Sequence, residues 1–444
     1  MKVIVGRSVG TIMGIDERLK WELYNSLRCP DMKRRNGWRI FFDLETSCFP
    51  AGLYSAVYYI AESLGYEVQL EYNYDEPVSM GMMLPQLRGY QADAVRAMLP
   101  YRRGLLQSCP RSGKTYIATA LIDHLYELRP ALVLCEKGEI VEQFSDTLEG
   151  LLGCTVGRAW KGRVENAKAD IMVGMIQTLK NGVWDALDDV RLLLIDEAHH
   201  AAADSYTALI HSLPNVCRVY GMSATPWRND GLDLQLEGNI GPVLHSVGYS
   251  ELIREINPDT GRPYLVAPDI LFQSVPRRDY PDDADWMQVY RDYVVNNTDR
   301  NSLIVSNVRW CQETGNTPVV VLVERIEHGE ALAAELKADF THGSVPWAER
   351  KRVLNALRNG DVDVVVSTLY REAVDIPRLP SVINAGASSS SIAFYQNMRN
   401  LTDYPGKTKA YVFEFYDDCR YLDRWSRRRL RLASAEPEFH IKTA

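Results

Sequence analysis

Gly104-Leu-Leu-Gln-Ser-Cys-Pro-Arg-Ser-Gly-Lys-Thr115 joins a short apolar run to a loop that ends in glycine, lysine and threonine. The apolar run predicts a strand over 104–107, and the pattern after the loop predicts a helix through Leu125. A strand, a loop of this kind and a helix in this order are the setting of a phosphate-binding loop. The stretch therefore predicts an α/β sheet with a nucleoside triphosphate at the end of one strand.

The loop residues have distinct expected roles toward ATP. Gly113 lets the backbone approach the phosphates, Lys114 meets the charge of the β- and γ-phosphates, and the Thr115 hydroxyl can bind Mg²⁺. With Ser112, which precedes them in the loop, these three residues are our candidate ligands of Mg²⁺ and ATP.

A second string, Asp196-Glu-Ala-His199, directly follows the apolar run 192–195. A carboxylate at a strand end can hold the ion shared with a phosphate loop, and its neighbour can polarise an attacking water. We assign Asp196 to Mg²⁺, Glu197 to the hydrolytic water, and His199 to a link with the next motif.

A third string, Ser223-Ala-Thr-Pro226, follows the next expected strand. Small hydroxyl side chains at that place can hydrogen-bond His199 or Glu197 and register whether the γ-phosphate is present. We therefore expect Ser223 and Thr225 to couple the nucleotide state to a bound polymer.

Short apolar runs alternate with amphipathic stretches from Leu84 onward, which indicates parallel sheets covered by helices on both faces. The polar stretch 257–285 interrupts the alternation, and we expect it to mark the passage between two lobes. We predict an α/β protein with a small α+β domain (1–80), a first lobe (81–245), and a linker with a second lobe (246–444). The expected strands are 131–135, 170–174, 192–195 and 218–222 in the first lobe, and 318–323, 363–367, 381–384 and 409–413 in the second.

The composition is ordinary for a water-soluble globular protein, with 46% hydrophobic and 24% charged residues. No apolar run approaches the roughly 20 residues that span a bilayer, so we expect no membrane contact. The N-terminus does not resemble a secretory signal. The 8 cysteines form no CxxC pair, which argues against a zinc site and a disulfide framework and favours the cytoplasm.

A net charge of −8 argues against a protein that coats nucleic acid passively. It does not exclude a protein that binds phosphates through local contacts. Backbone amides, helix N-termini and small basic patches are sufficient for such contacts. The stretches 33–39 and 424–431 each mix cations with a tryptophan, which can stack on a base.

With these strings in place, the chain resembles superfamily 2 helicases and translocases, and within them the DEAH-carrying, phage UvsW-like and XPB-like branch. The resemblance covers about 84–420 and implies two tandem RecA-like lobes. It also rests on further matching strings, which are Val173-Gly-Met-Ile-Gln-Thr-Leu179, Asn297-Thr-Asp-Arg-Asn301, Val321-Leu-Val-Glu-Arg-Ile-Glu-His-Gly329, Thr341-His-Gly343 and Ser367-Thr-Leu-Tyr-Arg-Glu-Ala-Val-Asp-Ile-Pro377.

The resemblance implies an ATPase that acts as a DNA helicase or translocase in replication, recombination or repair. It implies that Gln91, whose amide can pair with both edges of an adenine, reads the base of ATP. Asp375 would help to read the nucleotide state, and Arg399 would reach the γ-phosphate from the second lobe.

The same resemblance implies where single-stranded, duplex or forked DNA would lie. Thr178, Thr225, His342 and Thr368 would lie near a strand that runs across both lobes. The N-terminal domain would engage a duplex or a branch point through its basic cluster, which is Lys33, Arg34, Arg35 and Arg39.

The chain departs from the family pattern at three places. Ser108 replaces the first glycine of the phosphate loop, and Ala373 replaces the glycine usual in its motif. The last motif, Gln396-Asn-Met-Arg-Asn-Leu-Thr402, keeps only Arg399, one place out of register. An arginine finger contributes roughly 10³–10⁵ in rate, so hydrolysis is slow if Arg399 is misplaced, and Arg371 is the reserve candidate.

Four alternatives stay open at this point. The same engine can act on RNA, or it can be the motor subunit of a restriction or transcription complex. The altered last motif also fits an ATP-gated clamp that binds DNA with little turnover. Finally, Phe42-Asp-Leu-Glu-Thr46 looks like the first carboxylate pair of a two-metal exonuclease, in which Asp43 would be essential.

Overall fold

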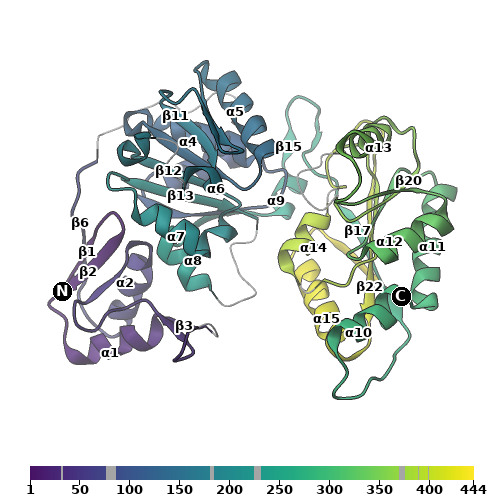
Figure 1. Cartoon of the computed structure of the whole chain (residues 1–444), viewed down its shortest axis with the longest axis horizontal. Helices are drawn as coiled ribbons and strands as arrows, with labels where there is room; N and C mark the ends of the chain where they lie inside the picture. Colours follow the sequence, from purple (N-terminus) through teal and green to yellow (C-terminus); the bar gives the residue numbers. More distant parts are fainter. Residues whose placement is uncertain are drawn as a thin grey trace. The chain divides into compact units, whose positions relative to one another are not determined.

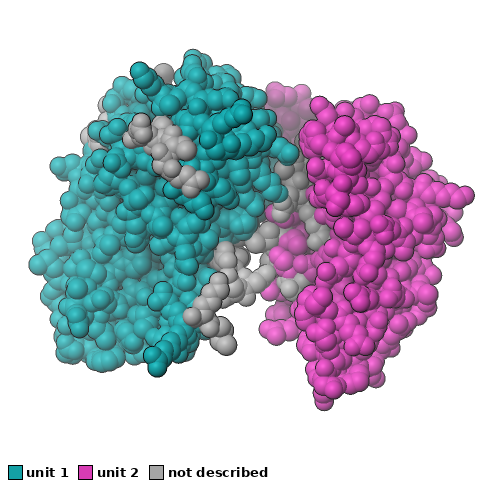
Figure 2. Space-filling model, in the orientation of Figure 1, with its two compact units in different colours: residues 1–247 teal, residues 248–444 magenta. Residues whose placement is uncertain are grey.

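The computed structural model of this protein describes residues 1–31, 34–76, 87–180, 185–224, 232–369, 376–388, 390–398 and 400–444. The chain divides into two compact units, Met1–Val247 and Gly248–Ala444, which are coloured separately in Figure 2.

Unit 1 begins with a small α+β module around a four-stranded sheet of order β5-β2-β1-β6. Strand β1 pairs with β2 in antiparallel and with β6 in parallel orientation. Helices α1 and α2 bury Leu19, Leu23 and Val57 against Val3 and Val5 of β1. The elements are β1 (Lys2–Val5), β2 (Val9–Met13), α1 (Glu17–Ser26), β3 (Arg28–Pro30), β4 (Trp38–Ile40), β5 (Cys48–Pro50), α2 (Tyr54–Ser63) and β6 (Gln69–Tyr72).

The rest of unit 1 is the first lobe, an eight-stranded sheet of order β10-β9-β11-β8-β12-β13-β7-β14. All neighbouring pairs are parallel except β9 with β10. Central strands such as β8 and β12 are buried on both faces, as expected of continuous apolar runs between helices. The strands are β7 (Arg103–Ser108), β8 (Ala131–Cys135), β9 (Gly157–Trp160), β10 (Arg163–Glu165), β11 (Ile171–Met175), β12 (Leu192–Asp196), β13 (Arg218–Ser223) and β14 (Val243–Val247).

Helices cover this sheet on both sides. In Figure 1, α7 and α8 lie on one side of β12 and β13, and α5 lies on the other. The α-helices in the described part of this lobe are α3 (Gly89–Met98), α4 (Lys114–His124), α5 (Gly138–Leu152), α6 (Ile176–Leu179), α7 (Asp204–His211) and α8 (Asp233–Asn239). The parallel sheet with crossover helices confirms the α/β class predicted for this part of the chain.

The N-terminal module is joined to the first lobe by buried polar contacts. Arg103 is 1% exposed and donates to the backbone oxygens of Arg7 at 2.5 Å and of Asn239 at 2.7 Å. The Tyr74 hydroxyl donates to the Cys217 oxygen at 3.0 Å. Because a buried guanidinium without partners is very costly, these contacts fix where the module sits on the lobe.

Unit 2 contains a seven-stranded, all-parallel sheet of order β19-β20-β18-β21-β22-β17-β23. Its strands are β17 (Pro268–Val275), β18 (Val319–Leu322), β19 (Asp339–Thr341), β20 (Val364–Ser367), β21 (Ser381–Asn384), β22 (Ala410–Asp417) and β23 (His440–Thr443). The other elements are α9 (Tyr249–Arg254), the pair β15 (Ile256–Asn257) and β16 (Arg262–Pro263), α10 (Trp286–Tyr290), α11 (Thr298–Glu313), α12 (Ile326–Leu336), α13 (Trp347–Asn359), α14 (Ser391–Asn397) and α15 (Arg420–Ser434).

One sequence expectation was wrong in this unit. The polar stretch 257–285, expected to link the lobes, contains β17, which pairs with both β22 and β23. Ile270 and Phe272 of β17 are buried. The sequence did not reveal this strand because its apolar run, Ile270-Leu-Phe272, is only three residues long and lies between polar, charged and proline residues.

Candidate active site

The phosphate loop lies between the end of β7 at Ser108 and the start of α4 at Lys114. Gly113 has φ +77°, and a Cβ atom there would come within 2.4 Å of the Gln91 Nε2 atom. Both the left-handed backbone and the close approach require glycine at this position. The Ser112 hydroxyl lies 2.8 Å from the Cys109 oxygen and 2.5 Å from the buried Ser108 hydroxyl. Ser108 therefore braces the loop, although the sequence presented it only as a departure.

Gln91 lies directly against this loop, with both ends of its amide in use. Its Nε2 donates to the Ser112 oxygen at 2.9 Å, and its Oε1 accepts from the Arg88 N–H at 3.0 Å. The Tyr90 hydroxyl donates to the same Ser112 oxygen at 3.0 Å. Sequence reasoning missed Tyr90, although its place beside Gln91 was a usable signal.

Lys114 and Glu197 form an ion pair in which Lys114 Nζ lies 2.9 Å from Glu197 Oε1. Burial alone would raise the pKa of Glu197, but the charges of Lys114 and His199 outweigh it and hold this pKa well below its usual range. Glu197 is therefore a carboxylate at all ordinary pH values. It also has φ +46°, a strained backbone for a residue with a side chain.

Asp196, at the end of β12, is held in a different state from its neighbour. Burial raises the pKa of Asp196 to about 6, against the attraction of Lys114. Its Oδ1 atom is buried and has no hydrogen-bond partner. Two adjacent carboxyl groups with separated pKa values are typical of a site where one holds a cation and the other handles a proton or water.

These residues fit a magnesium ion. The unpartnered Asp196 oxygen supplies one hard ligand, and Thr115 stands in the first turn of α4. No group of three or more histidine, cysteine, aspartate or glutamate side chains that could hold a metal occurs among the described residues. Mg²⁺ usually takes one or two carboxylates and completes its shell with water and phosphate oxygens.

His199 connects the acidic strand end with the end of β13. Its Nδ1 lies 3.1 Å from the Ser223 hydroxyl and 3.4 Å from Glu197 Oε2. His199 and Ser223 are both buried. The three side chains therefore form a continuous polar chain from the phosphate loop to the third motif. Thr225, the other predicted coupling residue, lies outside the described residues.

The basic cluster of the N-terminal module is divided by the fold. Arg34 has a side chain 56% exposed and lies 3.6 Å from the Asp31 carboxylate, and Arg35 is exposed. Arg39 instead lies 3.0 Å from Asp31 and 3.1 Å from Asp204 of α7, with its side chain only 12% exposed. Its guanidinium is already neutralised, so we leave it out of the nucleic-acid contacts proposed below. Lys33 lies outside the described residues.

The predicted nucleic-acid residues of unit 2 meet at one edge of its sheet. The Thr368 N–H donates to the Thr341 oxygen at 3.1 Å, which brings the end of β20 beside the residue before His342. The His342 ring lies 4.9 Å from the Phe340 ring. In unit 1, Thr178 of α6 is 4% exposed and accepts from the Gly162 N–H at 3.4 Å. Three predicted residues of unit 2 lie outside the described residues, namely Arg371, Asp375 and Arg399.

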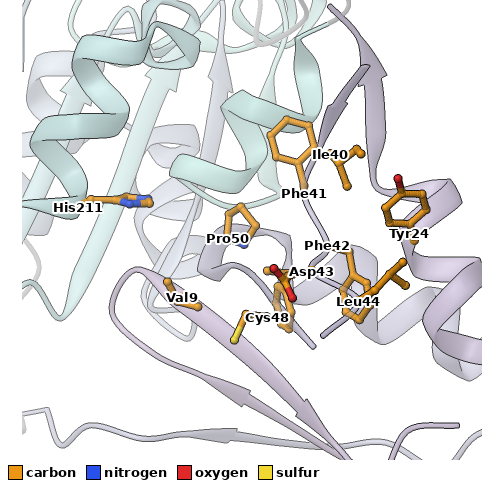
Figure 3. A pocket seen from close by; sticks show the side chains of 11 residues that line it. Val9, Tyr24, Ile40, Phe41, Phe42, Asp43, Leu44, Cys48, Pro50 and His211 are labelled. Atoms are coloured by element: carbon orange, nitrogen blue, oxygen red, sulfur yellow. The ribbon is translucent and has the colours of Figure 1, made fainter. Parts of the chain in front are cut away.

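The exonuclease alternative finds little support. Asp43 Oδ1 accepts from the backbone N–H groups of Glu45 at 2.9 Å and Thr46 at 2.7 Å, so it caps a turn. Figure 3 shows it at a pocket of about 490 Å³ in which Asp43 is the one carboxylate among the lining residues. The other lining side chains are mostly apolar, including Phe41, Phe42 and Phe49. An apolar pocket with a single carboxylate does not provide the ligands of two metal ions.

Two family models match the chain. Residues 84–228 match "Type III restriction enzyme, res subunit", and residues 300–399 match "Helicase conserved C-terminal domain". The "Putative DNA 3'-5' helicase Rad25" of Halobacterium salinarum is 26% identical over 313 residues, which are 68% of this chain and 49% of that protein. The chain spans about half the length of the curated relatives it matches.

Solved structures show a related fold. The ATP-dependent Type ISP restriction-modification enzyme LlaBIII bound to DNA aligns with 81% of this chain and 31% of its own, at 15% identity and a TM-score of 0.59. The crystal structure of T4 UvsW aligns with 100% of this chain and 99% of its own, at 17% identity and a TM-score of 0.48. The tandem RecA-like architecture predicted from the sequence is confirmed by the two parallel-sheet lobes and the first of these matches. No helix in the described part of the chain has the length and apolar character to cross a membrane.

Proposed function

Because the chain belongs to the superfamily 2 helicases, we propose that it is an ATP-dependent helicase or translocase that moves on or remodels DNA. Helicase domains imply the use of a nucleotide and a nucleic acid. We propose further that the nucleotide is ATP, bound with Mg²⁺, and that the polymer is DNA.

One observation carries the proposal, which is the polar chain from Lys114 through Glu197 and His199 to Ser223. Lys114 is paired with Glu197. A γ-phosphate beside the loop competes for Lys114, because a phosphate carries more charge than one carboxylate. Glu197 is then released to orient the attacking water, and His199 transmits its new position to Ser223.

Thr115 and Asp196 are the residues that would hold Mg²⁺, and the ion would neutralise charge on the β- and γ-phosphates. Asp196 must be ionised to do so. The neighbouring Glu197 charge opposes that ionisation, and Lys114 favours it. The charges of the Lys114–Glu197 pair thus also influence the ionisation of Asp196.

In this proposal the second lobe supplies further residues that contact the nucleotide and the nucleic acid. Arg399 would contact the γ-phosphate and Asp375 would report the nucleotide state, and both assignments rest on the family resemblance. His342 and Thr368 of unit 2, with Thr178 and Thr225 of unit 1, would lie along a single strand. Arg34 and Arg35, together with Lys33, would contact duplex or branched DNA, which suits replication, recombination or repair.

The test compares phosphate release by the full chain with single-stranded, duplex and forked DNA and with RNA. We expect DNA-stimulated hydrolysis that Lys114→Ala abolishes, because Lys114 is the one cation held at the phosphate loop by Glu197. The control is Lys168→Ala, an exposed lysine of the same unit. Wild-type stimulated activity in the Lys114→Ala protein would refute the active site.

The other outcomes of this assay separate the alternatives. Stimulation by RNA alone identifies an RNA helicase. Binding of ATP and DNA with almost no phosphate release identifies an ATP-gated clamp. Activity that requires an added partner identifies the motor subunit of a larger complex.

A further inference from the structure

Unit 2 carries two tryptophans beside an arginine-rich helix, and the site described above uses none of them. Trp286 of α10 and Trp425 of α15 have ring centroids 6.4 Å apart with an angle of 61° between the rings. Helices α10 and α15 lie side by side in Figure 1. The rings belong to a pocket of about 490 Å³ lined by Ala284, Asp285, Trp286, Tyr421 and Trp425. Trp286 is 44% exposed, although tryptophan has a large apolar surface to bury.

The floor of this pocket is built into the core of the unit. Ala284, Tyr421 and Trp425 are partly buried and pack against the main apolar cluster. Arg420 donates to the backbone oxygens of Pro281 and Asp282, which ties the preceding loop to the start of α15. The pocket is therefore preformed, and a ligand would lose little free energy in ordering it.

Helix α15 presents a cationic face beside the pocket. Its buried stripe is Leu422, Ser426, Arg429 and Ala433. The exposed stripe is Arg424, Arg427 and Arg431, which recur at helical spacing. Arg427 lies 2.9 Å from Asp423, whereas Arg424 and Arg431 have no ion pair within the described residues.

Three acidic side chains near the pocket have partners, whereas the exposed Asp283 has no ion pair within the described residues. Asp285 caps α10 by accepting from the Met287 and Gln288 N–H groups. Asp282 lies 3.5 Å from Arg420, and Asp423 accepts from Arg427. Arginines thus offset the charges of Asp282 and Asp423, and the cations of Arg424 and Arg431 remain available for an anionic ligand.

We propose that this surface binds single-stranded nucleic acid, with a base stacked on the exposed Trp286 ring, which Trp425 meets edge to face, and phosphates on Arg424 and Arg431. A preformed aromatic pocket next to unpaired arginines is what a strand requires, since each base offers a flat π-face and each linkage a negative charge. The proposal deepens the proposed function and rests on it, because the polymer is taken to be the one on which the motor acts.

Photocrosslinking tests the contact directly. The full chain is irradiated with a 5-iodouracil-containing single-stranded DNA or RNA oligonucleotide, and the crosslinked peptides are identified by mass spectrometry. We expect crosslinks at Trp286 or Trp425, with the more reactive of the two polymers identifying the natural strand. Crosslinks confined to other peptides for both polymers overturn the proposal.

The second test measures the affinity of the full chain for a labelled oligonucleotide by fluorescence anisotropy, with no ATP added. Trp286→Ala should weaken binding about 5- to 150-fold, the factor for one lost stacking contact, whereas Trp286→Phe should retain most of the affinity. The control Trp310→Ala changes a 39% exposed tryptophan of the same unit and should leave affinity unchanged. Removing both Arg424 and Arg431 should reduce the slope of log K against log salt by about 1.4, or ~0.7 per phosphate.

The two proposals can fail separately. If Lys114→Ala retains stimulated ATPase while the crosslinks appear, the active-site assignment fails and this surface stands. If stimulated ATPase is normal but Trp286→Ala binds like the wild type, the surface proposal alone fails. Basal ATPase should be unchanged in all the tryptophan and arginine variants, because none of these residues belongs to the phosphate site.

Discussion

Replacing Arg300 by methionine should destabilise unit 2 strongly, because its guanidinium is fully buried at the centre of a charge network. Arg300 Nε lies 2.8 Å from Asp417 Oδ1, and both side chains are 0% exposed. Its Nη1 donates to the Ala385 oxygen at 2.7 Å, and its guanidinium lies 4.6 Å from the Phe415 ring centroid. A second buried pair, Arg429 with Glu414 at 2.8 Å, adjoins it.

The magnitude follows from what the substitution leaves behind. Methionine fills a similar volume but cannot donate, so the Asp417 carboxylate stays buried with Arg429 at 3.6 Å as its remaining charge partner. Removing one member of a buried ion pair costs about 3–5 kcal/mol. Exposed pairs contribute about 0–1 kcal/mol, so Arg352→Met, with a side chain 55% exposed, is the matched control.

Native-state hydrogen exchange, detected by mass spectrometry, measures the loss of stability separately in unit 1 and unit 2. A loss of 3–5 kcal/mol in opening free energy speeds exchange of the protected β18 and β21 amides roughly 100- to 5,000-fold. Peptides of unit 1 serve as the internal reference. Adding Asp417→Asn removes the stranded charge, so the double variant should lose less than the two single variants together. Exchange in Arg300→Met within about fivefold of the wild type would refute the reasoning.

Two further predictions concern the phosphate site. Binding of Mg²⁺ with ATP should weaken as the pH falls through about 6, because burial raises the pKa of Asp196 to about 6 and a protonated carboxyl cannot hold the ion. Titration with a fluorescent ATP analogue checks this, and Asp196→Asn should bind weakly with no such pH step; a step that persists in that variant assigns it to another group. Gly113→Ala should weaken ATP binding about 5- to 30-fold, because left-handed φ costs an alanine about 1–2 kcal/mol, and its Cβ would also displace the Gln91 amide. The control Gly150→Ala, in the open interior of α5, should leave ATP binding unchanged, and equal affinity in both alanine variants would contradict this account.

The sequence predicted the engine of unit 1 because its signals are local. An apolar strand, a short loop and a helix are adjacent along the chain, so Lys114 had to stand at the start of the helix that follows β7, and Asp196 at the end of β12. Parallel pairing then brings the carboxyl ends of these strands to one edge of the sheet. The separation of the two carboxyl pKa values, in contrast, needed coordinates, because it depends on burial and on the Lys114 charge.

Two side chains have partners that the sequence did not indicate. Arg39 was grouped with a nucleic-acid cluster, yet its partner Asp204 lies 165 residues away. Ser108 was noted only as a missing glycine, yet its hydroxyl meets Ser112. In each case the side chain hydrogen-bonds a partner that the composition and the motif spacing do not identify.

By itself, the sequence determined most of the central apolar strands of both sheets, the phosphate loop, the acidic strand end and the two-lobed plan, because each is encoded by neighbours along the chain. Only the tertiary structure decided which charged side chains are engaged. Arg300 and Arg429 are buried anchors, Arg103 joins the N-terminal module to its lobe, and Arg424 and Arg431 lie exposed beside two tryptophans. The physical reason is that the role of an arginine depends on which carboxylates, carbonyls and water molecules surround its guanidinium in space. The sequence identifies the arginine but not those surroundings.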